Sequence, residues 1–172
     1  HDVSRPDRDI PDYWNLYNTN PLVSQPIDTL ANEVVESGWY FEADSQETVD
    51  ELTEFAEEVA IINNEVRKNL TGLLHSNVIT HQVTGTVFVE KVTNRDDDRP
   101  SALQPLQTST VEVYTKPNTS ILVAPDDKFD GIHYTEDDEA AAYVQFETGI
   151  SKYSEREERR FTRDEVIQWN RG

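Results

Sequence analysis

The spacing of apolar residues changes once along this chain, near Gly85. Before Gly85 apolar residues recur every three to four positions, which is typical of helices; after it they alternate, which is typical of strands. A glycine at this junction is suited to end a helix. We therefore predict an α+β fold, in which N-terminal helices are followed by a mixed or antiparallel sheet.

Local signals set the expected element boundaries. Asp12 is suited to cap a short first helix, and Asn20-Pro21 to open the second, because proline at the first helical position loses no hydrogen bond. Helices are predicted over 12–18, 21–37, 46–61 and 64–82. Strands are predicted over 39–41, 86–92, within 103–114, over 121–123 and 140–147, and in a closing hairpin over 155–160 followed by 161–169. The buried core is expected to include Ile27, Leu30, Val34, Phe55, Val59, Leu70, Leu74, Phe88, Tyr143 and Phe146.

The polar first residues differ from the rest of the chain. Residues 1–11 contain Pro6 and Pro11 and are predicted to form an extended arm, with a single α+β domain over 12–172. No methionine occurs, even at position 1. We therefore expect the natural chain to begin upstream of His1 and this sequence to be a fragment of a longer one.

The strong acid excess indicates adaptation to high salt. Asp and Glu number 34 against 15 Lys and Arg, giving a net charge of −19, and Lys is rarer than Arg. Three tryptophans, seven tyrosines and six phenylalanines argue against a disordered chain. At molar salt the Debye length is about 3 Å, so a dense acidic surface is tolerated. At low salt such a surface repels DNA and anionic membranes.

No pattern of catalytic or metal-binding residues stands out. There are no cysteines, no glycine-rich phosphate loop and no apolar run near the roughly 20 residues of a membrane helix. His75 and His81 lie six residues apart, which is unsuited to a helical metal pair. The acidic loop 125–139 lacks calcium-loop spacing. We therefore predict no catalytic residue, no cofactor, no metal and no membrane contact.

Three stretches, in order, resemble tailed-virus portal proteins. The first is 17–41, with a short helix, Asn-Pro, and an apolar helix ending near glycine and aromatic residues. The second is 66–92, where a helix ends at glycine before a strand containing Glu90, and a turn and the Leu-x-Pro-Leu-like stretch 103–106 follow. The third is 161–169, FTRDEVIQW. Gln168 departs from the histidine that is usual near the end of the third stretch.

The resemblance implies a structural rather than enzymatic protein, corresponding to the N-terminal wing region of a portal subunit. Portals form rings, usually of about twelve subunits, with closed cyclic symmetry at one capsid vertex. Implied partners are further copies of the chain, the major capsid protein, the large terminase subunit, head–tail adaptors and viral DNA that passes without sequence-specific binding. The implied location is the virion, and the host cytoplasm during assembly, with a halophilic archaeal host.

Aromatic residues near the start are the expected contact sites with neighbouring subunits or capsid. They are Tyr13, Trp14, Tyr17, Trp39 and Phe41. Two alternatives stay open: a free-standing halophilic binding domain, and a metal-dependent enzyme in which Asp126, Asp130 and Glu136 converge on one cation.

Overall fold

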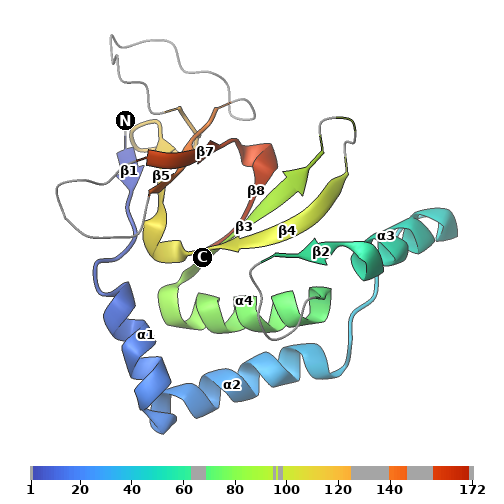
Figure 1. The fold of residues 1–172 in the computed structure, drawn as a ribbon, viewed down its shortest axis with the longest axis horizontal. Coiled ribbons are helices and arrows are strands. Elements are labelled where there is room, and N and C mark those ends of the chain that lie inside the picture. Colours follow the sequence, from blue (N-terminus) through green and yellow to red (C-terminus); the bar gives the residue numbers. More distant parts are fainter. Residues whose placement is uncertain are drawn as a thin grey trace.

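Two four-stranded sheets share a core, and helices cover the outer face of one of them (Figure 1). The computed structural model describes residues 2–62, 69–94, 96, 99–124, 140–146 and 157–170. The first sheet is antiparallel, in the order β1 (Asp2–Ser4), β5 (Val111–Thr115), β6 (Tyr143–Phe146), β7 (Glu157–Phe161). The second is mixed, in the order β2 (Ala60–Ile61), β4 (Pro100–Leu106), β3 (Thr86–Thr93), β8 (Val166–Asn170). The α+β prediction is confirmed.

Four helices are described, and side chains cap three of them at the first turn. They are α1 (Ile10–Thr19), α2 (Pro21–Glu36), α3 (Gln46–Glu58) and α4 (Leu70–Thr84). Asn20, Ser45 and Asn69 accept backbone N–H groups at the starts of α2, α3 and α4. Gly85 ends α4 with φ of +82°, and its N–H donates to the His81 carbonyl at 2.9 Å. Gly85 therefore has the helix-ending role that its sequence position predicts.

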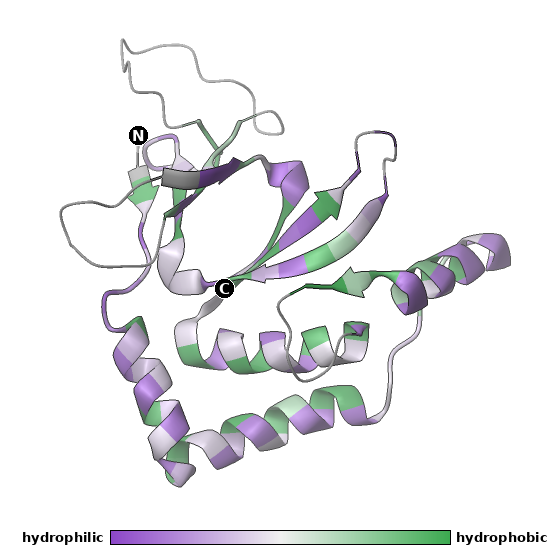
Figure 2. Cartoon of the chain, viewed as in Figure 1, coloured by the Kyte–Doolittle hydropathy of each residue, from purple (hydrophilic) through white to green (hydrophobic). Residues whose placement is uncertain are grey.

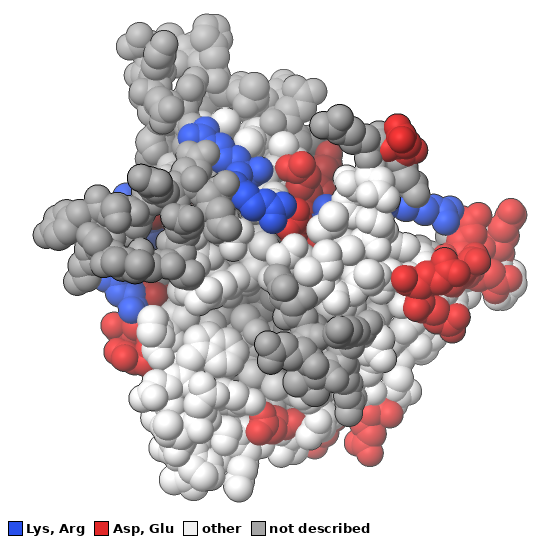
Figure 3. Space-filling view, viewed as in Figure 1, with Lys and Arg blue, Asp and Glu red and all other residues white. Residues whose placement is uncertain are grey.

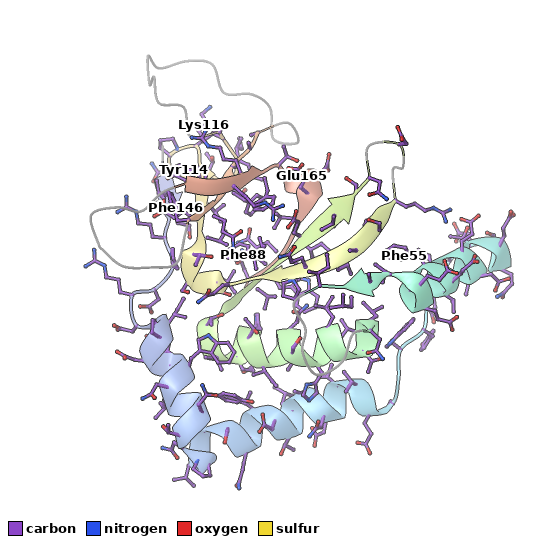
Figure 4. The ribbon with its side chains drawn as sticks, in the orientation of Figure 1. Phe55, Phe88, Tyr114, Lys116, Phe146 and Glu165 are labelled. Atoms are coloured by element: carbon purple, nitrogen blue, oxygen red, sulfur yellow. The ribbon has the colours of Figure 1, made fainter. Side chains whose placement is uncertain are left out.

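The core between the sheets takes side chains from both. Phe88 of β3 and Tyr143 of β6 meet edge to face with ring centroids 6.1 Å apart, and Figure 4 labels Phe88 in this interior. Two short 3₁₀ turns, η1 (Thr108–Thr110) and η2 (Arg163–Glu165), carry the chain between the sheets. The buried members of this core are Phe88, Leu106, Val111, Val113, Leu122, Ala140, Ala142, Tyr143, Phe161 and Val166.

A second core lies between β3–β4 and the helices. Val87 and Val89, on the opposite face of β3 from Phe88, pack with Leu73 of α4, and Phe55 joins them where α3 meets β2 (Figure 4). α2 packs on the far side of α4, so sheet, α4 and α2 form successive layers (Figure 1). Hydrophobic residues concentrate on α4 and the strands, whereas α1 and α3 are largely hydrophilic (Figure 2).

Several predicted boundaries are corrected. Residues 39–41 are not a strand; Trp39 instead contacts α4 through a hydrogen bond to Thr71. The third helix ends at Glu58, since Val59 turns to φ −59° and ψ 127° and lets β2 pair with β4. Residues 121–123 contribute one bridge, from Leu122 to Thr115, after a turn in which Asn118 has φ of +57°.

The two ends of the chain are more firmly attached than the patterns suggest. Residues 2–4 of the predicted extended arm pair with β5, and α1 begins at Ile10, two residues early. The predicted strand 86–92 is confirmed as β3, and the predicted turn and last strand over 161–169 as η2 and β8. Of the predicted strand 140–147, the structure forms 143–146. The predicted helix start over 64–68 and the acidic loop 125–139 lie outside the described residues.

The predicted core is confirmed only in part. Val59, Phe88 and Tyr143 are buried. Five others are half-buried: Ile27, Phe55, Leu70, Leu74 and Phe146. Leu30 and Val34 are exposed instead, at 38% and 52%. These two residues face away from α4 because the neighbouring positions Ala31 and Val35 take the inner face of α2.

Candidate subunit interface

The predicted contact residues on α1 lie where α1 meets α2. Ile10 anchors the start of α1 at 2% exposure, and Asn20 both ends α1 and caps α2. The Tyr17 hydroxyl donates to Asp28 of α2, which fixes the corner between the helices. The Tyr13 hydroxyl donates to Asp7 Oδ2 at 3.0 Å.

Acidic partners keep these tyrosines protonated. Burial, together with the hydrogen bond to Asp28 and its charge, raises the pKa of Tyr17 to about 12. The hydrogen bond to Asp7 likewise raises the pKa of Tyr13. Both hydroxyls therefore act as donors within the chain.

Trp14 borders a groove between α1 and the sheet region. Its ring meets the Tyr17 ring edge to face, with centroids 5.7 Å apart. The groove has a volume of about 420 Å³ and is lined by Ile10, Pro11, Trp14, Thr80, Leu106, Gln107, Thr108 and Ser109. Trp14 is half-buried and Tyr13 is 38% exposed, so part of this aromatic surface faces solvent.

Trp39 and Phe41 have partners within their own chain. Trp39 Nε1 donates to Thr71 Oγ1 of α4 at 3.0 Å. The two aromatic rings lie 5.4 Å apart in an edge-on arrangement, and both side chains are half-buried. These contacts hold the segment after α2 against α4, and a further contact with another subunit stays a prediction.

The outer row of α2 is an apolar surface that the sequence analysis missed. Leu22 is 85% exposed, and the apolar row that starts there continues through Pro26 to Leu30 and Val34. Leu30 and Val34 were predicted to be core because they fall within the apolar pattern of this helix. A helix needs one apolar face to pack, yet α2 has apolar residues on two adjacent rows, and that excess is the signal of an additional surface.

Acidic residues predominate over α3, whereas the sheets carry acidic and basic residues together. In Figure 3, acidic side chains gather over α3 and the lower edge of the molecule, while basic side chains gather over the first sheet. Arg5 of that region binds Glu112 at 3.3 Å, and the hydroxyl of Tyr114 donates to the same carboxylate at 2.8 Å. Burial and the Glu112 carboxylate raise the pKa of Tyr114 to about 12.

Other potentially reactive residues make structural contacts. His75 Nε2 lies 3.0 Å from Asn32 Oδ1 and links α4 to α2. Within the described residues no three His, Asp or Glu side chains group as a metal site. Asp126, Asp130 and Glu136, the ligands of the enzyme alternative, lie outside the described residues. No described helix has the length and apolar character needed to cross a membrane.

Comparison with known proteins identifies no relative. No protein-family model matches the chain, and no curated protein matches it either. The candidate interface is therefore argued from its own residues.

Proposed function

We propose that the chain is a structural subunit of a ring-shaped assembly, the wing region of a portal at a viral capsid vertex. The observation that carries the proposal is aromatic surface on α1, where Tyr13 is 38% exposed and the half-buried Trp14 borders a groove. A chain of net charge −19 is otherwise well suited to remain soluble. Contiguous apolar surface in such a chain favours contacts with other molecules.

The positions of the portal-like stretches support the same proposal. The Asn-Pro stretch covers the end of α1 and all of α2, the glycine-ended helix is α4 and leads into β3, and the last stretch covers η2 and most of β8. β8 pairs directly with β3, so the second and third stretches adjoin in one sheet. The resemblance and the fold thus agree in the kinds of element.

In the proposed ring, the groove beside Trp14 receives a neighbouring subunit. Head-to-tail repetition of one interface closes a ring, so the surface that enters the groove is a different one from the groove itself. Proposed partners beyond the ring are the major capsid protein, the large terminase subunit and head–tail adaptors. DNA is proposed to pass the ring without sequence-specific contacts, and the subunit itself to catalyse nothing.

Electron microscopy of the chain in molar KCl tests the proposal. Rings of about a dozen subunits are the expected result. Trp14→Ala should reduce ring formation while far-ultraviolet circular dichroism stays unchanged. Tyr40→Ala, at a residue 80% exposed outside the groove, is the matched control. A monomer at every concentration would contradict the proposal and favour a free-standing binding domain.

A further inference from the structure

We propose that the exposed face of α2 binds a basic amphipathic helix of another protein. The face consists of Leu22, Pro26, Leu30 and Val34, and is called here the outer α2 face. Binding at this face is compatible with a ring subunit and with a free-standing domain. Its test is therefore independent of ring formation.

The outer α2 face is continuous. Its members are four residues apart, and with 1.5 Å of rise per residue they extend over about 18 Å. Leu22, Leu30 and Val34 are 85%, 38% and 52% exposed. A shallow groove of about 480 Å³ runs along the first part of this row, lined by Pro21, Leu22, Gln25, Pro26, Thr29, Leu30 and Glu33.

Packing within the chain does not use this face. α2 packs on α4 through the adjacent row, Val23, Ile27, Ala31 and Val35, of which Ala31 is fully buried. Successive residues of a helix are separated by about 100°, so each outer residue is turned by that angle from the α4-facing residue that follows it. A single exposed leucine is ordinary, but a row of four apolar residues marks a binding surface.

The charge around the face selects the partner. α2 itself carries the acids Asp28, Glu33 and Glu36 and no Lys or Arg, and from Asp9 to Ile62 the chain has 13 acidic residues and no basic one. Glu33 lines the groove itself. Two copies of this face would place acids against acids, which is unfavourable. A partner with Lys and Arg beside its apolar residues is complementary.

The shape of the face selects a helical partner. A helix surface has no row of free backbone groups to pair with an extended segment, as a sheet edge has. A bound segment must therefore satisfy its own backbone hydrogen bonds, which a helix does. Pro26 also cannot donate to the Leu22 carbonyl four residues earlier, so a basic side chain of the partner has a nearby acceptor.

Binding of a synthetic peptide to the full chain tests the proposal. The probe is a helical peptide of about five turns, with Leu along one face at positions four apart and Lys beside it. Binding is measured by fluorescence anisotropy at several KCl concentrations. We expect saturable binding, at least a tenfold loss of affinity in Leu22→Ser/Val34→Ser, and no loss in the control Ile121→Ser, whose side chain is 40% exposed outside this face. Glu33→Gln/Glu36→Gln should reduce the salt dependence of binding.

Two results would overturn the proposal. The first is unchanged affinity of Leu22→Ser/Val34→Ser for the peptide, or equal binding of a peptide with Glu in place of Lys. The second is self-association of the chain in sedimentation that disappears in Leu22→Ser/Val34→Ser, which would assign the face to a second copy. If the double variant folds poorly, peptide binding is measured with Leu22→Ser alone, because Leu22 is 85% exposed.

Discussion

Arg159 of β7 reaches across the interior and donates to Glu90 of β3, which joins the two sheets by an ion pair. The Glu90 side chain is only 7% exposed, and its Oε2 has no hydrogen-bond partner in the part of the chain that the structure describes. The Arg159 guanidinium also lies 4.7 Å from the centre of the Phe161 ring. The buried carboxylate therefore depends on Arg159 for its compensation.

Removing Arg159 alone should destabilise the fold. In Arg159→Met the Glu90 carboxylate stays buried without its cation, at a cost of about 3 kcal/mol. This is at the low end of the range for buried pairs, because the Arg159 side chain is 43% exposed. Urea unfolding in molar KCl measures the loss.

The double variant Glu90→Leu/Arg159→Met separates charge burial from simple packing. It should recover most of the stability that Arg159→Met loses, since no unpaired charge then remains between the sheets. A double variant no more stable than Arg159→Met would mean that packing of the arginine stem, rather than pairing, matters.

Filling the α2–α4 contact should also destabilise the fold. Ala31 is fully buried at this contact, so Ala31→Leu must displace atoms of α4, at a cost of about 2 kcal/mol. Val34→Leu, on the outer α2 face and 52% exposed, should change the free energy of unfolding by less than about 0.5 kcal/mol. Equal effects of both substitutions in urea unfolding would contradict the packing assigned to α2.

Local sequence signals predicted where helices begin and end better than they predicted which distant segments pair. Capping by Asn20 and Ser45 and the glycine stop at Gly85 depend on neighbouring residues, and all three were foreseeable. The pairing of Asp2–Ser4 with β5 joins segments more than a hundred positions apart, and no local pattern encodes it. The same holds for β2, which is two residues long and exists only beside β4.

The candidate interface was foreseeable in part for the same reason. Tyr13 and Trp14 were predicted to be contact residues because they are aromatic residues in a polar stretch of the sequence. The periodicity of α2 indicated Leu30 and Val34 as apolar but not which row would face α4. That choice depends on Ala31, whose small side chain lets α2 and α4 approach closely, and sequence periodicity does not weigh side-chain size.

Stability should fall steeply in strongly alkaline solution. The pKa values of Tyr17 and Tyr114 are about 12 in the folded chain, against an ordinary value of 10. Above pH 10 the unfolded chain loses these protons while the folded chain keeps them, so the stability they provide is complete below pH 10 and is lost as pH rises toward 12. Unfolding measured across this range should show a shallower pH dependence in Tyr17→Phe and Tyr114→Phe. Tyr40→Phe, at an 80% exposed position, should match the unchanged chain.

Lowering the salt concentration should unfold the helices α1–α4, called here the helical layer, before the sheets. The Debye length grows from about 3 Å at 1 M to about 10 Å at 0.1 M, so repulsion among the acids of α1–α3 then acts over the whole layer. The sheets carry acids and bases together, including the Arg5–Glu112 and Arg159–Glu90 pairs, and are less affected.

The tryptophans make this order measurable. Trp39 contacts α4, whereas Trp169 lies on the same face of its sheet as Val87, which packs against α4. A variant with Trp39 as the sole tryptophan therefore reports on the helices, and a variant with Phe161→Trp as the sole tryptophan reports on the core between the sheets. As KCl falls, emission of Trp39 should shift at a higher salt concentration than emission of the Phe161→Trp variant, and helical circular dichroism should follow Trp39. Sodium chloride at equal ionic strength is the control and should replace KCl in keeping the helices folded, because screening depends on ionic strength. Emission and dichroism that stay unchanged down to 0.1 M KCl would contradict both the order of unfolding and the adaptation to high salt.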